Sequence, residues 1–190
     1  MRAYVDESVH LIGAPSMYVL ASVVVQHQEA DEVRAVLRDS RGNRRNRFHW
    51  VNEEQVDREA LAKTVGALDL FSVVAVCSPI DNKRQERARR LCLTQLLWEL
   101  ESRGVHDVLL ESRGAQDLKD QEHISNRQLP RPAGPRLAYG FGSPTAEPLL
   151  WLPDLVAGAV AYNQAGRIQG TNCLTLLGTA VTIINADEGT

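Results

Sequence analysis

The segment YVDES, residues 4–8, places an acid inside a run that otherwise has the pattern of a β-strand. Alternation along a strand puts Tyr4 and Asp6 on one face and Ala3 and Val5 on the other. Burying an ionised carboxylate without a partner is costly, so Asp6 is expected to need a positive charge or a metal ion nearby. The ordinary alternative is that Asp6 ends the strand and caps a turn. Glu7 points to the opposite face unless it serves as a second acid.

Outward from this segment, the chain alternates strand-like and helix-like stretches. The run MYVLASVVVQ, residues 17–26, is almost continuously apolar and β-branched, which is typical of a strand covered on both faces. Its closeness to the first strand favours an antiparallel hairpin. Further strands are predicted at 70–77, 105–111 and 137–142, and helices at 29–38, 52–69, 81–103, 115–128 and 148–164. Residues 171–184 fit either a strand or a helix.

These elements predict one α/β domain over residues 1–190, with a mixed five-stranded sheet and helices on both faces. The helices at about 29–69 form an insertion between the second and third strands. Without that insertion, three strands precede alternating helices and strands, which is the order of the ribonuclease H fold. Many α/β domains share such an order, so the assignment has to rest on where the candidate catalytic acids fall in the sequence.

Composition narrows the classes of function. A net charge of −3 argues against a generically basic nucleic-acid-binding protein. Only three of the 21 basic residues are lysines, and the arginine excess suits bidentate phosphate contacts, although a GC-rich genome produces the same bias. Three cysteines without short spacing predict no zinc site and no disulfide framework, and favour a reducing, cytoplasmic compartment. We expect no signal peptide and no membrane span, because no uncharged apolar stretch reaches about 18 residues.

Two more acids fall where the pattern predicts burial or a sheet edge. Glu111 ends the apolar run VLLE, and Asp154 lies inside LLWLPDLVAGAV. If both meet Asp6, their shared negative charge favours a pair of Mg²⁺ or Mn²⁺ ions, which take oxygen ligands and catalyse phosphodiester cleavage when about 4 Å apart. The alternatives are that Glu111 pairs with Arg113 and that Asp154 interacts with the positive end of its helix.

Four segments, YVDES, MYVLASVVV, VLLESR and EPLLWLPDLVAGAV, resemble those of a domain-of-unknown-function family of bacterial and phage proteins that is regarded as ribonuclease H-like. The resemblance spans about residues 4–162. It implies that Asp6, Glu111 and Asp154 match the family's three acids, in a placement closer to RuvC-type resolvases than to ribonuclease H itself. Glu111 stands where the family usually has aspartate, and Pro153 where it often has alanine.

Basic and imidazole side chains are candidates for supporting roles. His49 is loosely matched to a histidine or lysine of the family, and we expect it to act as a metal ligand, acid–base group or phosphate contact, or else as a structural histidine. Arg45 and Arg47 lie in an arginine-rich loop just before it, and Arg113 follows Glu111 by two residues. All three arginines are candidate phosphate contacts.

Several polar and aromatic residues are open to a functional and a structural interpretation. Asp117 and Asp120 could supply a fourth ligand, but their polar helix favours solvated surface acids. Trp50 could stack on a base, although anchoring a loop is favoured. Trp98 and Trp151 are predicted core residues. A second basic stretch could follow a nucleic-acid backbone or simply form a solvated helix face; it contains Arg84, Arg87, Arg89 and Arg90.

The sequence therefore predicts a metal-dependent nuclease that hydrolyses DNA or RNA by a two-metal mechanism. Asp6, Glu111 and Asp154 are the predicted catalytic metal ligands, and His49 is a further catalytic candidate. Two alternatives remain: a phosphohydrolase acting on nucleotides, and a ribonuclease H-like module that binds nucleic acid or protein without cleaving. No sequence feature indicates an oligomeric state.

Overall fold

A computed structural model of the chain describes residues 1–11, 15–42, 47–128, 136–168 and 170–186. Within these residues, six strands form one mixed sheet in the order β5-β4-β1-β2-β3-β6. The strands are β1 Arg2–His10, β2 Met17–Val25, β3 Ser72–Cys77, β4 Asp107–Glu111, β5 Ala138–Gly142 and β6 Val181–Asn185. β2 is antiparallel to β1 and to β3, whereas β4 is parallel to β1 and to β5, and β6 is parallel to β3.

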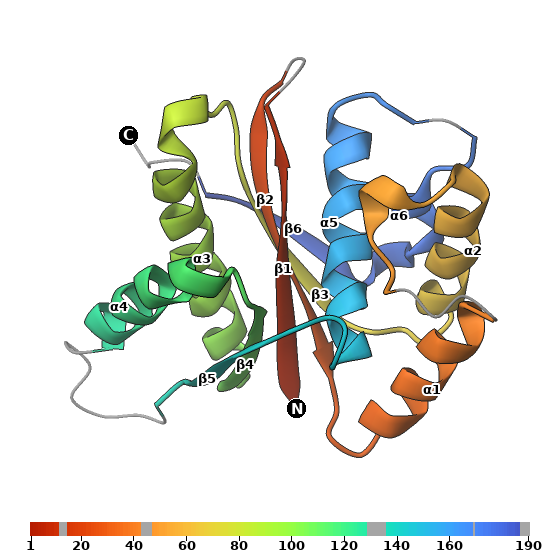
Figure 1. Cartoon of the computed structure of the whole chain (residues 1–190), viewed down its shortest axis with the longest axis horizontal. Helices are drawn as coiled ribbons and strands as arrows, with labels where there is room; N and C mark the ends of the chain where they lie inside the picture. The colour runs from red at the N-terminus through yellow and green to blue at the C-terminus, as the bar shows by residue number, and fades with distance from the viewer. Residues whose placement is uncertain (12–14, 43–46, 129–135, 169, 187–190) are drawn as a thin grey trace.

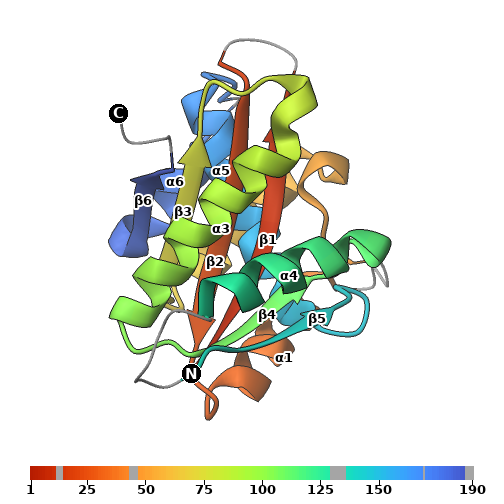
Figure 2. The same cartoon turned by 90° about the vertical axis from the view of Figure 1, so that its left-hand side faces the viewer.

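Helices cover both faces of this sheet, as predicted. They are α1 Ala30–Ser40, α2 Gln55–Gly66, α3 Gln85–Ser102, α4 Asp117–Gln128, α5 Trp151–Gln164 and α6 Cys173–Leu176. Figure 1 shows the sheet edge-on, with α3 and α4 on one side and α5, α1, α2 and α6 on the other. Figure 2 shows α3 and α4 lying across their face of the sheet. No described helix is both long and apolar enough to cross a membrane.

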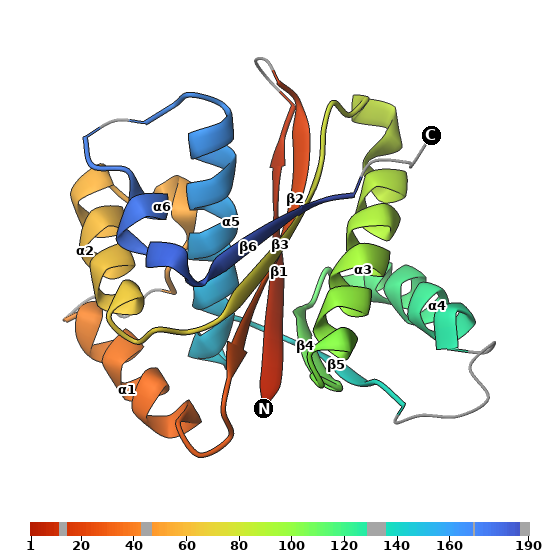
Figure 3. The ribbon, with the colours of Figure 1, turned by 180° about the vertical axis from the view of Figure 1, so that it is seen from behind.

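The prediction of five strands is wrong by one, because 171–184 contains both a short helix and most of β6. Periodicity alone cannot assign so short an apolar run. What makes it a strand is pairing: Val181 to Asn185 align with Ser72 to Val76 of β3. Figure 3, from behind, shows β6 beside β3 at the outer edge of the sheet. The strand's partner is thus set by tertiary structure.

The core lies in two layers, one on each side of the central strands. Every residue of β2 is buried, which confirms the prediction of a strand covered on both faces. Trp151 is buried as predicted, but Trp98 is wrong as a core residue, because 58% of it is exposed on α3. The leucines of α3 already fill the side that faces the sheet, including Leu93, Leu96, Leu97 and Leu100.

The register of β1 and β4 brings two of the predicted acids to neighbouring positions, one in the middle of β1 and one at the end of β4. Their ladder consists of Ala3–Val108, Tyr4–Leu109 and Val5–Leu110. The next residue on β1 is Asp6, and the next residue on β4 is Glu111. Alternation then directs both of these side chains to the face of the sheet that α5 covers.

Candidate active site

Asp6, Glu111 and Asp154 converge on the α5 side of the sheet. Asp6 comes from the middle of β1, Glu111 is the last residue of β4, and Asp154 lies in the first turn of α5. Asp6 is 8% exposed and Asp154 is 6% exposed. Burial raises the pKa of Asp6 well above its ordinary value, and the negative charges of Glu111, Glu7 and Asp154 raise it further. The acids are therefore close enough to repel one another.

Asp154 is fixed by the loop that precedes α2. Its Oδ2 accepts the backbone N–H of Trp50 at 3.0 Å and lies 3.1 Å from His49 Nδ1. The hydrogen bond to Asp154 raises the pKa of His49, although partial burial opposes it, so the imidazolium form is favoured. Pro153 is tolerated because it is the third residue of α5, where its missing N–H has no partner to lose.

Glu111 has one basic neighbour and one acidic neighbour. Arg47 Nη1 lies 3.2 Å from Glu111 Oε1. Burial raises the pKa of Glu111, while the charge of Arg47 and a hydrogen bond with Asp6 lower it. Burial and the neighbouring acids thus disfavour the charged forms of both Asp6 and Glu111.

The donor chemistry of this site fits a hard divalent cation. Three carboxylates offer oxygen ligands of the kind that Mg²⁺ and Mn²⁺ prefer. A cation bound here would offset the negative charges that, after burial, raise the pKa of Asp6. Within the described part of the chain, however, no three histidine, cysteine, aspartate or glutamate side chains are already grouped as a metal site. Asp154 instead points one oxygen at the Trp50 amide.

The remaining predicted site residues are distributed unevenly. Arg47 and His49 lie beside the acids, whereas Arg45 falls outside the described residues. Arg113 is not brought to the acids: its guanidinium bonds to Asp120 at 2.9 Å and to Gln116 at 2.8 Å on the α4 side of the sheet. We therefore leave Arg113 out of the candidate site.

The structure corrects the interpretations of two polar or basic residues and confirms that of a third. Asp120 is wrong as a solvated surface acid, because it is 1% exposed and bound by Arg89. Arg89 is itself buried and is not part of a solvated helix face. Glu7 points to the face opposite Asp6, as alternation predicts, and accepts a hydrogen bond from Arg89. In the arginine-rich loop, Arg41 is bound through both of its terminal nitrogens to Glu53.

Sequence reasoning missed Gly158, which lets the loop carrying His49 approach α5. Trp50 is 2% exposed and anchors that loop, as favoured from the sequence. A Cβ at residue 158 would lie 2.2 Å from Cδ2 of the Trp50 ring, so only glycine leaves room for the indole. The run of small residues AGA at 157–159 was the available signal. The close contact holds the Trp50 amide against Asp154.

Gly158→Ala should therefore destabilise the protein, although glycine-to-alanine changes within helices are usually favourable by up to about 1 kcal/mol. Overpacking against a buried indole costs about 1–3 kcal/mol, which exceeds the gain in helix propensity. Equilibrium unfolding in urea measures the difference. A variant that is more stable than the wild type would show that the Trp50 ring can move to make room for the new methyl group and does not fix the loop.

The sheet, with β2 antiparallel to β1 and β3 and with β4 and β5 parallel to β1, has the mixed arrangement expected for a ribonuclease H-like fold. Comparison with solved structures agrees: the chain is similar to a ribonuclease HIII, a mutant protein of Bst-RNase HIII, with a TM-score of 0.53 and 12% sequence identity. The match covers 87% of this chain and 53% of that one, so this chain spans about half the length of that protein. At this identity the likeness concerns the fold.

Sequence comparisons add no family. No family model matches the chain, and no curated protein matches it. The resemblance to a domain-of-unknown-function family therefore stays a prediction, while the ribonuclease H-like fold has structural support.

Proposed function

We propose that this protein is a metal-dependent nuclease that hydrolyses phosphodiester bonds of DNA or RNA. Asp6, Glu111 and Asp154 would hold two Mg²⁺ or Mn²⁺ ions, which supply a nucleophilic water and stabilise the leaving oxygen when bound. The observation that carries the proposal is that the β1–β4 register sets Asp6 and Glu111 directly after the pair Val5–Leu110, on the face of the sheet that α5 and its Asp154 cover. The structural similarity to a ribonuclease HIII supports the proposal at the level of the fold.

Three basic residues have roles in this proposal. His49 lies against Asp154, which favours its cationic form, so His49 is suited to contact a phosphate or give a proton to the leaving oxygen. Arg47 has a side chain that is 42% exposed beside Glu111, and its guanidinium suits a phosphate oxygen of the substrate. Arg45 is proposed as a second phosphate contact from its position in sequence.

The direct test is cleavage of labelled single- and double-stranded DNA and RNA by the full chain, with Mg²⁺, Mn²⁺ or EDTA. We expect cleavage that depends on the metal and stops with EDTA. Binding of nucleic acid without cleavage under either metal would favour the non-catalytic module. Hydrolysis of free nucleotides without cleavage of polymers would favour the phosphohydrolase.

Mn²⁺ should also raise the melting temperature of the protein. A ligand that binds only the native state stabilises it, by about 2.7 kcal/mol when its free concentration is 100 times the dissociation constant. Thermal unfolding in EDTA and then in increasing Mn²⁺ measures this directly. Asp154→Asn should show a smaller shift, while Glu122→Gln, at an exposed position on α4, should shift like the wild type. Absence of a shift at millimolar Mn²⁺ would count against the metal site.

A further inference from the structure

A buried ionic network lies on the face of the sheet opposite the candidate active site. Its centre is Arg89 of α3, which is 1% exposed. Arg89 Nη2 donates to Asp120 Oδ2 at 2.6 Å, and Nε lies 2.9 and 3.1 Å from the two oxygens of the same carboxylate. Arg89 Nη1 donates to Glu7 at 2.8 Å and to the hydroxyl of Tyr18 at 3.1 Å. One guanidinium thus joins α3 to β1, β2 and α4.

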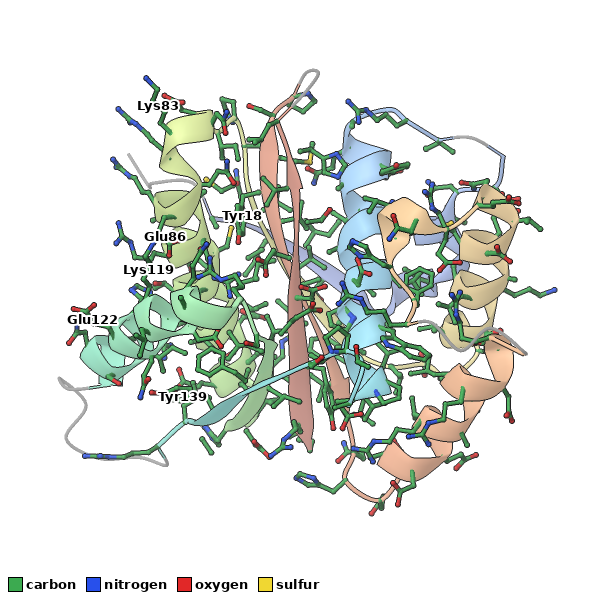
Figure 4. All side chains as sticks on the ribbon, viewed as in Figure 1. Tyr18, Lys83, Glu86, Lys119, Glu122 and Tyr139 are labelled. Carbon is green, nitrogen blue, oxygen red and sulfur yellow. The ribbon has the colours of Figure 1, made fainter. Side chains whose placement is uncertain are left out.

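The network continues from Asp120 to the strand end of β4. Asp120 is 1% exposed and also accepts a hydrogen bond from Arg113 Nη2 at 2.9 Å. Arg113 lies 3.4 Å from Glu86 of α3, and Lys119 approaches the same Glu86 oxygen. Figure 4 shows Tyr18 between the sheet and α3, and Glu86 with Lys119 where α3 meets α4. The chain of contacts therefore runs from Glu7 through Arg89 and Asp120 to Arg113.

Both ends of this chain are adjacent to proposed metal ligands. Glu7 directly follows Asp6, and Arg113 is two residues beyond Glu111. The β1–β4 ladder ends with the pair Val5–Leu110, one residue before both acids. Among the described residues, no β1–β4 pair therefore holds together the residues that follow Asp6 and Glu111.

We propose that Arg89 and Asp120 form a positioning pair for the candidate active site: through Glu7 and Arg113 they fix, from the opposite face of the sheet, the separation between Asp6 on β1 and Glu111 at the end of β4. This inference rests on the proposed metal site. A buried ion pair is weak evidence of stabilisation, because desolvation offsets the attraction. Its several directional hydrogen bonds instead fix a geometry. Residues that orient metal ligands without touching the metal often tune the affinity for the metal.

The same two helices provide a matched control. Arg127 of α4 is bound to Glu101 of α3, with side chains that are 11% and 8% exposed. This pair is also a buried arginine–carboxylate contact between α3 and α4, but neither residue is next to Asp6 or Glu111 in the chain. A purely structural role in docking α4 predicts the same behaviour for both pairs.

The test compares Arg89→Lys with Arg127→Lys by calorimetric titration of EDTA-treated full-length protein with Mn²⁺, alongside thermal unfolding. Lysine keeps the charge but not the planar fork that contacts Glu7 and Asp120 together. We expect both variants to melt earlier than the wild type. Arg89→Lys should bind Mn²⁺ about tenfold or more weakly, whereas Arg127→Lys should stay within about twofold of the wild type.

A second variant covers the case in which Arg89→Lys does not fold. Asp120→Asn keeps the volume of the side chain, and it should weaken Mn²⁺ binding in the same direction. Equal Mn²⁺ affinity in the wild type and the folded variants overturns the positioning role and leaves the metal site standing. Failure of the wild-type protein to bind Mn²⁺ overturns the metal site, and the positioning role with it. If Arg127→Lys weakens Mn²⁺ binding as much as Arg89→Lys does, Arg89 acts only by docking α4 against α3, and the inference is overturned.

Discussion

Asp6→Asn should reduce metal-dependent cleavage by about 1000-fold or more, which corresponds to about 4 kcal/mol of lost transition-state stabilisation. The change keeps the size of the side chain and removes its charge from a site where only 8% of the residue is exposed. Burial raises the pKa of Asp6, and the negative charges of Glu111 and Asp154 raise it further. Loss of its charge should therefore weaken the binding of any ion that the three acids share.

Single-turnover cleavage at several Mn²⁺ concentrations measures this effect and separates weaker metal binding from slower chemistry. Glu122→Gln is the control, because it removes one negative charge from an exposed position on α4. That variant should cleave at the wild-type rate. Wild-type cleavage by a folded Asp6→Asn protein would falsify the assignment of Asp6 as a metal ligand.

The convergence of the acids was predictable because each one interrupts a locally apolar pattern. Asp6 breaks a strand, Glu111 ends one, and Asp154 lies inside an apolar helix. Such placements are costly unless tertiary structure supplies a partner, so the three point to one site before any coordinates are known. The antiparallel pairing of β1 with β2 was also predictable, since two strands that are close in sequence favour a hairpin.

What escaped prediction depends on partners that lie far away in the sequence. The helix carrying Asp120 has the composition of a surface helix, but the acid is buried where it binds Arg89, 31 residues earlier, and Arg113. Arg113 was assigned to the substrate by its distance of two residues from Glu111, but it points to the other face of the sheet. The identity of β6 as a strand likewise depends on pairing with β3.

Without metal, the protein should lose stability as the pH rises, and Asp6→Asn should remove much of that loss. Burial raises the pKa of Asp6 above its ordinary value of 3.8, so the native state binds the proton more tightly than the unfolded state does. The resulting stabilisation is complete below the ordinary value and disappears as the pH rises through the raised pKa. Each unit of difference in pKa is equivalent to about 1.4 kcal/mol.

Other groups near the site contribute with the same sign, so the comparison must be between variants. The pKa of Glu111 is raised by burial and that of His49 by its bond to Asp154, and both also lose stabilisation at higher pH. Melting temperatures of EDTA-treated wild type and Asp6→Asn, from about pH 4 to about pH 8, isolate Asp6 as the difference between the two curves. The gap should widen in favour of the variant with rising pH and reverse in Mn²⁺, because only the wild type keeps all three carboxylates. Parallel curves in EDTA would mean that Asp6 is ionised at no cost in the native protein, and that the three acids do not share a repulsive site.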